Sequence, residues 1–393
     1  MIERFSILYA GHVDMDNIGY DGTPVNERFL SDEHLASALA TTEDIAKAAD
    51  RLGYNTLWLA EHHFQREGYE CLPNLLMQFV HLSHLTKNIK FGCAFNVPPM
   101  WHPLRLAEDY ALADRLTDGR VIFGLGRGYH TREVESFGSP MLDKEANRDL
   151  FEEQVEILFK AFNNRSFSHH GKYFDIPPKV PYRGYQLEEI TLVPRPKHLP
   201  VECWQPIVSS SVRGIDFMVK HGIKAISGGG AAPGGAARAV VEAWRDAHAR
   251  AGRETQLGED LIIGEKFHIA DSREKAIKEA RPYFEENTKM FGPLGFVGGL
   301  TEEQKKDLEN PTPELWETLP TIEDDVRVGQ FLCGTPEQII EPLMLLQDLY
   351  PGLREINIQP LISTPRNVIL EQLERFAEEV MPAFKVAETR PAS

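Results

Sequence analysis

Glu61, His62 and His63 follow an apolar stretch in the segment WLAEHHF, residues 58–64. A carboxylate and an imidazole can both serve as a general acid or base near neutral pH. If the apolar stretch is a strand, neighbouring side chains point to opposite sides, so only one of the two histidines can easily face a central cavity. We therefore predict catalytic roles for Glu61, His62 and His63. We expect no metal, because a metal site would need further ligands from other strands.

A second candidate site is the glycine-rich segment VIFGLGRGYHTREVESFG, residues 121–138. Its spacing is G-x-G-x-G, which differs from the G-x-G-x-x-G fingerprint of dinucleotide-binding folds. Arg127 stands among the glycines, where the backbone can approach a ligand closely and a guanidinium can bind phosphate. The segment indicates a phosphate contact, with a tightly packed strand end as the alternative.

A third candidate is PIVSSSVRGIDFMVKHG, residues 206–222, where three serines precede a predicted helix that contains Arg213 and Gly214. Free amides at a helix N-terminus, hydroxyl groups and a cation together can bind a phosphate. A serine that only caps its helix is the alternative. The glycine-rich stretch SGGGAAPGG, residues 227–235, could also approach a phosphate. Together these segments predict a phosphorylated cofactor.

The elements that must position these residues alternate between strands and helices. Apolar runs predict eight strands, at residues 5–10, 56–60, 89–95, 121–125, 206–209, 224–227, 261–269 and 355–359. Amphipathic stretches lie between them, such as TTEDIAKAADRLGY (residues 41–54), with Thr41 and Thr42 as candidate caps, and HPLRLAEDYALADRLTDGR (residues 102–120). Repeated strand–helix units favour a (β/α)8 barrel over an open doubly wound sheet.

Three stretches exceed the minimal repeat, at residues 11–37, 164–204 and 285–330. We interpret the chain, residues 1–393, as one barrel domain with these insertions. In a barrel the first and third follow strands one and seven, on the face where active sites lie. Residues 285–330 combine glycines with Phe291, Phe296 and Trp316, so we predict a mobile lid over the active site.

The composition argues against some classes of binding partner. The net charge is −17 over 393 residues, which would repel nucleic acid and anionic membranes. The four cysteines are scattered without a CxxC pair, and the N-terminus resembles a first strand rather than a signal peptide. We expect a cytoplasmic protein that acts on a small molecule.

WLAEHHF, residues 91–129 (FGCAFNVPPMWHPLRLAEDYALADRLTDGRVIFGLGRGY) and CGTPEQI (residues 333–339) together resemble the bacterial luciferase-like flavin-dependent monooxygenases. The likeness extends from the first strand to the terminal helix. It implies a (β/α)8 barrel that binds reduced FMN, supplied by a separate NAD(P)H-dependent flavin reductase. The family reacts this flavin with O2 to form a flavin (hydro)peroxide, which oxygenates an organic substrate. The resemblance also suggests a homodimer.

The resemblance assigns roles to individual positions. His62 matches the active-site histidine of the family and His63 its neighbour. Arg127 and, less closely, Arg148 match arginines near the flavin phosphate, while Ser210, Ser211 and Gly214 match the phosphate-binding turn. Ala94 and Phe95 match a strand end where the family often has a non-proline cis peptide beneath the flavin ring. The chain differs from luciferase at Gly126 and Ser210, which favours a non-luminous member.

Other functions remain open. A deazaflavin-dependent hydride-transfer enzyme shares this superfamily and could use the same phosphate features. A metal-dependent hydrolase could use Glu61, His62 and His63, and a non-catalytic flavin-binding protein is a further alternative. The substrate is not specified by the sequence, although aromatic residues in the predicted loops suggest an apolar or aromatic molecule: Tyr9, Tyr20, Phe64, Phe95, Trp101, Tyr129, Phe291, Phe296 and Trp316.

Overall fold

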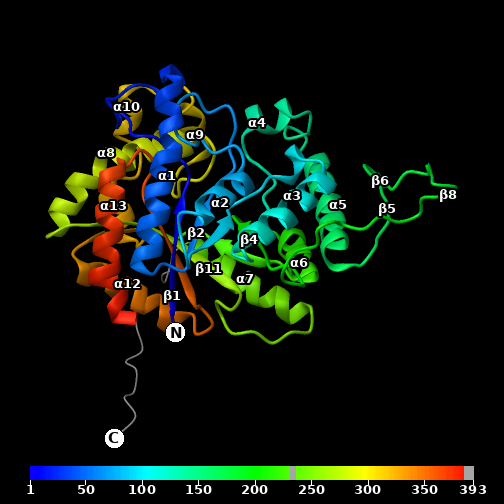
Figure 1. Ribbon diagram of the computed structural model, residues 1–393. Coiled ribbons are helices and arrows are strands. Elements are labelled where there is room, and N and C mark those ends of the chain that lie inside the picture. The colour runs from blue at the N-terminus through cyan, green and yellow to red at the C-terminus, as the bar shows by residue number, and fades with distance from the viewer. Residues whose placement is uncertain (231–235, 385–393) are drawn as a thin grey trace, which may run out of the picture.

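The structure is a computed structural model that describes residues 1–230 and 236–384 (Figure 1). Its centre is a closed barrel of eight parallel strands, because β1 pairs with both β2 and β13, and β10 pairs with β9 and β11. This confirms the predicted (β/α)8 barrel. The barrel strands are β1 (Arg4–Tyr9), β2 (Thr56–Leu59), β3 (Lys90–Cys93), β4 (Val121–Gly124), β9 (Cys203–Ile207), β10 (Lys224–Ser227), β11 (Leu261–Ile269) and β13 (Glu355–Gln359).

Helices surround the barrel. The long ones are α1 (Asp32–Leu52), α2 (Leu75–Ser83), α3 (Pro103–Leu116), α5 (Lys144–Asn163), α6 (Val212–His221), α7 (Ala236–Arg250), α8 (Arg273–Phe291), α12 (Pro336–Leu349) and α13 (Arg366–Arg375). The predicted caps Thr41 and Thr42 are wrong. Helix α1 begins earlier, after Ser31, and the Thr42 hydroxyl donates to the Ala38 carbonyl 2.7 Å away inside the helix. Gly53 ends α1 in a left-handed backbone conformation, with φ of 82°.

Two strands differ from the predicted set. The fifth barrel strand, β9, ends at Ile207 and begins at Cys203, before the predicted start at Pro206. Proline usually marks a strand start or edge, yet here Pro206 pairs in register with Ile226 inside the wall. A ninth strand of the main sheet, β12 (Phe331–Gly334), pairs with the second half of β11, beyond the residues where β11 pairs with β10.

The inside of the barrel is filled by side chains. Trp58, Trp204, Ile226 and Ile262 are buried together there, and Leu8, Ile122, Ala94 and Phe95 pack against them. Alternate residues of the same strands, such as Ile7, Leu57 and Phe91, face outward into the layer between strands and helices. Because the barrel is packed, a ligand must bind at the ends of the strands.

The first and third insertions pack against each other at the carboxyl ends of the strands. Arg28 of residues 11–37 forms a buried ion pair with Glu286 of α8, with 3.0 Å between Nη2 and Oε1. Tyr20 stacks on Trp316 at 4.4 Å. Residues 285–330 are not one open loop: they begin inside α8 and include α9 (Glu302–Asp307), α10 (Pro313–Trp316) and α11 (Ile322–Arg327).

The second insertion lies between α5 and β9. It forms two short antiparallel hairpins, β5 (His169–His170) with β6 (Asp175–Ile176), and β7 (Pro181–Tyr182) with β8 (Tyr185–Gln186). Figure 1 shows this segment extending away from the barrel. It therefore does not contribute to the barrel mouth.

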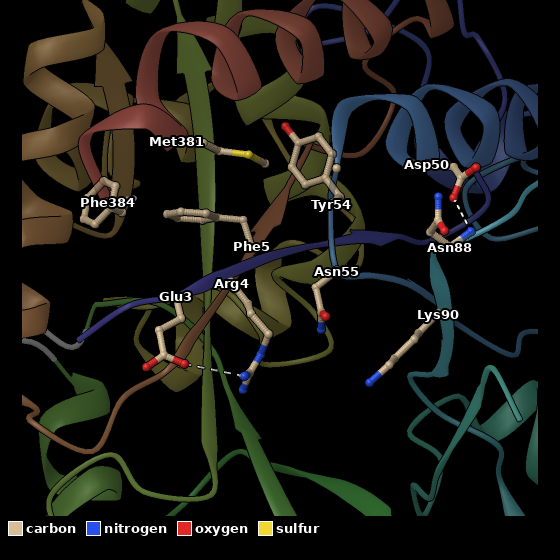
Figure 2. Close-up of a pocket in the computed structure, with 11 residues that line it drawn as sticks. Glu3, Arg4, Phe5, Asp50, Tyr54, Asn55, Asn88, Lys90, Met381 and Phe384 are labelled. Atoms are coloured by element: carbon tan, nitrogen blue, oxygen red, sulfur yellow. Dashed lines mark hydrogen bonds and ion pairs between the residues drawn. The ribbon is translucent and has the colours of Figure 1, made fainter. Parts of the chain in front are cut away.

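A cavity of about 360 Å³ lies at the amino ends of β1 and β3, opposite the candidate active site (Figure 2). Arg4, Asn55 and Lys90 line it on one side, and Phe5, Tyr54 and Met381 on the other. Arg4 is held there by Glu355, with 3.0 Å between Nε and Oε2. The predicted site residues are not among those that line this cavity.

The four cysteines, Cys71, Cys93, Cys203 and Cys333, are free thiols. Among the described residues, no helix has the length and apolar character that a membrane-spanning segment requires.

Candidate active site

His62 lies at the carboxyl end of β2, within a cluster of buried polar side chains. Its Nδ1 atom is 3.2 Å from both carboxylate oxygens of Glu133. Its Nε2 atom is 3.0 Å from the Tyr129 hydroxyl and 3.2 Å from Oε1 of Glu70. The Tyr129 hydroxyl donates to the same Glu70 oxygen at 2.8 Å. Both ring nitrogens of His62 therefore face acceptors, which favours the doubly protonated imidazolium.

The carboxylates control the charge of this cluster. Burial alone would lower the pKa of His62, but Glu70 and Glu133 outweigh burial and hold that pKa above its ordinary value. Burial would likewise raise the pKa of Glu70, yet His62 and His130 hold it below its ordinary value. Burial and the Glu70 charge raise the pKa of Tyr129, so its hydroxyl stays protonated. The cluster can thus hold a proton on His62 and pass it through Tyr129.

Glu61 occupies a different position from His62. Its Oε2 atom accepts from the Val97 amide at 2.8 Å, and its Oε1 atom accepts from the Trp101 indole at 2.7 Å. His63 Nε2 is 3.1 Å from Glu61 Oε1, and the His63 ring packs edge-on against Phe137 at 4.8 Å. This geometry favours a positioning role for Glu61 and His63, in which they fix the chain after β3.

Glu61, His62 and His63 do not converge as a metal site would require. Glu61 and His63 contact each other, while His62 turns to Glu70 and Glu133. Among the described residues, the group whose ligand atoms do converge is His62, Glu70 and His130, all within 4.8 Å of one another.

The predicted phosphate-side residues gather on a second side of the mouth. Arg148 of α5 reaches Gly214, where an added Cβ would lie 3.5 Å from Arg148 Nη1 and 3.8 Å from Ser211 Oγ. Ser211 is the N-cap of α6, and its side chain makes no cap hydrogen bond. The first amides of α6 are free of intrahelical partners by geometry. Ser210 precedes them and is exposed.

Arg127 joins the same group after β4. Its Nη1 atom donates to the Asn147 side chain at 3.2 Å, and Asn147 donates back to the Arg127 carbonyl at 3.3 Å. Burial and the neighbouring Arg148 cation lower the pKa of Arg127. Two guanidiniums beside a helix N-terminus are able to bind an anion. Residues 231–235 of the predicted glycine-rich stretch lie outside the described residues.

Between these two sides, the Ala94–Phe95 peptide bond is cis, as the resemblance implied. Gly126 lies directly against it: a Cβ at Gly126 would be 3.2 Å from Phe95 Cβ. Glycine at this position therefore lets the end of β4 approach the end of β3 closely.

The predicted lid residues divide into two groups. Phe296 packs edge-on against Tyr129 at 4.8 Å, and Phe291 lies behind Phe296 at 6.4 Å. Trp316 instead stacks on Tyr20, away from His62. Phe296 therefore covers the hydroxyl partner of His62.

Sequence reasoning missed Glu70, Glu133 and His130, and it named Tyr129 only as a loop aromatic. These residues lie in the loop before α2 and around α4 (Thr131–Ser136), where no helical or strand period marks them. The available signal was the repetition of acidic residues close to His62 and His130, in the loops that follow β2 and β4.

The chain belongs to the luciferase-like monooxygenase family, whose profile matches residues 22–351. It is 34% identical over 147 residues to the uncharacterized protein y4vJ of Sinorhizobium fredii, a stretch that covers 37% of this chain and 40% of that one. It is 27% identical over 134 residues to the oxygenase component of the flavin-dependent trigonelline monooxygenase of Acinetobacter baylyi, which covers 34% and 36% of the two chains. The matched stretches thus span about two fifths of these relatives.

Solved structures share the fold. The oxygenating constituent of 3,6-diketocamphane monooxygenase from Pseudomonas putida, in complex with FMN, superposes with a TM-score of 0.70 at 17% identity, over 98% of this chain and 100% of that one. An F420-dependent secondary alcohol dehydrogenase superposes with a TM-score of 0.64 at 15% identity, over 98% and 100%. At these identities the likeness establishes the barrel fold.

Proposed function

We propose that the chain is the oxygenase component of a two-component flavin-dependent monooxygenase. It would take reduced FMN from an NAD(P)H-dependent flavin reductase and use O2 to oxygenate a small apolar or aromatic molecule. The observation that carries this proposal is the pairing of an anion site with a buried proton-holding cluster on one stretch of chain. Arg127 belongs to the first, and Tyr129 and Glu133 to the second.

The residues present fit FMN. Arg127, Arg148 and the free amides of α6 match a phosphate dianion in charge and donor chemistry. Ser210, Ser211 and Gly214 would complete this turn, and Ala94 and Phe95 would lie beside the ring system. When bound, reduced FMN supplies the electrons that activate O2, whose chemistry belongs to the cofactor.

The chain's own residues would supply orientation, proton transfer and exclusion of water. His62 Nε2 and the Tyr129 hydroxyl would deliver or accept a proton at the substrate, while Glu133 holds the ring of His62. Residues 285–330 would act as a lid, with Phe296 excluding water from Tyr129. Two copies of the chain would form the working dimer.

Purified protein, reduced FMN, air and candidate substrates provide the test. We expect saturable binding of FMN and incorporation of one oxygen atom from labelled O2 into the product. Failure to bind FMN would remove the basis of the proposal. FMN binding without turnover of any substrate would favour a non-catalytic flavin-binding protein.

Hydride transfer to or from a deazaflavin is the second candidate, because the F420-dependent dehydrogenase has the same barrel and this anion site suits either cofactor. Oxygen uptake separates the two functions. A monooxygenase consumes O2 in proportion to product, whereas a deazaflavin enzyme turns over equally well without air.

A further inference from the structure

His62, Glu70 and His130 bring three metal-binding atoms together in a buried place. His130 Nε2 is 2.9 Å from Oε2 of Glu70, and His62 Nε2 is 3.2 Å from Oε1 of the same carboxylate. The two imidazole rings cross edge to face with centroids 5.2 Å apart. Relative exposures are 6% for His62, 2% for Glu70 and 9% for His130. His62 and Glu70 lie in the connection between β2 and α2, and His130 lies after β4, so the fold brings two segments together to form the group.

The type of ligand selects the kind of ion. Two imidazoles and one carboxylate are the donors of catalytic zinc sites, which leave one coordination position open. Zinc–ligand bonds are about 2.0–2.2 Å long. The three ligand atoms lie within 4.8 Å of one another, so small side-chain movements would bring all three within bonding distance of one ion. Magnesium and calcium prefer oxygen ligands alone, so this group favours a transition metal.

Neighbouring residues already support such a site. Glu133 holds His62 Nδ1 at 3.2 Å, which leaves Nε2 as the ligand atom, and Gln65 donates to Glu133 at 2.9 Å. A carboxylate behind a ligating histidine is a recurring support of metal sites. The Tyr129 hydroxyl, 3.0 Å from His62 Nε2 and 2.8 Å from Glu70, lies where a fourth ligand would be placed.

Charge favours a dication as well. Glu70 and Glu133 are both buried carboxyl groups, and each lies 3.2 Å from His62. Carboxylates in a dry site need a compensating positive charge. A divalent ion bound by His62, Glu70 and His130 would supply it.

We propose that His62, Glu70 and His130 form a binding site for one divalent transition-metal ion such as Zn²⁺, and that the bound ion blocks the oxygenase reaction by occupying His62 Nε2. The second half of this proposal rests on the proposed function, in which His62 Nε2 carries a proton. The first half depends only on the three ligands. Zinc would thus act as a reversible inhibitor.

The test begins with full-length, chelator-treated protein in the absence of flavin, titrated with Zn²⁺ by calorimetry and with Co²⁺ by visible spectroscopy. We expect one ion per chain and the visible spectrum of a four-coordinate Co²⁺ ion. Glu70→Gln and His130→Ala should each weaken binding by at least about 100-fold, and Glu133→Gln by about 10- to 100-fold. Circular dichroism of each variant checks that it is folded.

His169→Ala is the matched control, because His169 also contacts a glutamate, Glu153, at 3.1 Å but belongs to the second insertion. It should bind Zn²⁺ as the unaltered chain does. Equal Zn²⁺ affinity in the unaltered chain, Glu70→Gln and His130→Ala, or less than one ion per chain, would overturn the site.

Inhibition is measured separately. One equivalent of Zn²⁺ should abolish formation of the oxygenated product from substrate, reduced FMN and O2, and a chelator should restore it. If Zn²⁺ binds at the three ligands but the oxygenated product still forms at the same rate, the inhibitory role is wrong while the site stands. If the metal-free chain shows no FMN-dependent reaction, the proposed function fails, and the Zn²⁺ titration still decides the site.

Discussion

His62 and the side chains around it are the residues whose removal should slow the reaction most. We predict that His62→Ala lowers the rate of substrate oxygenation by about 10²- to 10⁴-fold, because positioned proton transfer contributes rate factors of this size. FMN binding should change little, since Arg127 and Arg148 lie on the other side of the mouth. Single-turnover kinetics with preformed reduced FMN measure the first effect, and equilibrium titration the second. Normal oxygenation and coupling in His62→Ala would exclude His62 from proton transfer.

The anion site yields a different prediction. Arg148→Ala should weaken FMN binding by about 10- to 100-fold, the loss expected when one hydrogen bond to a charged group is removed. Riboflavin, which lacks the phosphate, should bind the unaltered chain and the variant alike. Arg105→Ala, an exposed arginine paired with Glu108 on α3, serves as the control. A similar loss of affinity for riboflavin would contradict a phosphate contact by Arg148.

Some features of the candidate site could be predicted from the sequence, and others could not. WLAEHHF predicted the position of His62 at a strand end, and the serines predicted the start of α6, because both depend on local patterns. The sequence could not show that Glu61 accepts hydrogen bonds from Val97 and Trp101, or that Glu70, Tyr129 and Glu133 surround His62. The contacts with Val97, Trp101, Tyr129 and Glu133 join loops that follow different strands, so their geometry depends on barrel closure.

Among the elements, the segment that follows β11 reaches the candidate active site through Phe296, whose ring packs against Tyr129. We predict that Phe296→Ala leaves FMN binding unchanged but lowers the fraction of consumed O2 that appears in product, because Phe296 shields Tyr129. Parallel measurement of oxygen uptake and product detects the change. Tyr185→Ala, an exposed aromatic substitution on the distant β8, is the control. Full coupling in Phe296→Ala would count against a lid role for this part of residues 285–330.

The ends of helices and strands could be predicted where a local sequence signal marks them. Helix α3 begins at Pro103, within the predicted amphipathic stretch 102–120, because proline in the first helical turn is a local signal. Helix α1 begins well before Thr41, because Ser31 caps it by accepting a hydrogen bond from the His34 amide. Strand β12 was missed because its four residues pair with only the end of β11, a contact that the repeat of strand and helix does not predict.

At the scale of the whole molecule, one buried carboxyl group links stability to pH. Glu265 on β11 is fully buried, and burial raises its pKa from 4.5 to about 8. The folded chain therefore retains a proton that the unfolded chain loses above about pH 4.5. The stability this proton contributes is fully present below pH 4.5 and is lost as the pH rises toward 8.

Glu265→Gln keeps the shape of the side chain but removes this titration. We predict that the free energy of unfolding of the variant, relative to the unaltered chain, increases between pH 5 and pH 8 by up to about 4 kcal/mol. Urea unfolding at several pH values measures the difference. A constant difference across that range would show that Glu265 does not carry a raised pKa.

The barrel as a whole brings an anion site, a proton-holding cluster and a covering segment together at one end of its eight strands. The proposed oxygenation of a substrate with reduced FMN uses all three. The most direct measurement supplies the purified chain with reduced FMN and ¹⁸O₂, screens apolar and aromatic candidates, and analyses products by mass spectrometry. We predict a product that carries one ¹⁸O atom, formed only when FMN is present. Substrate turnover that proceeds without O2 and leaves no label in the product would contradict the assignment.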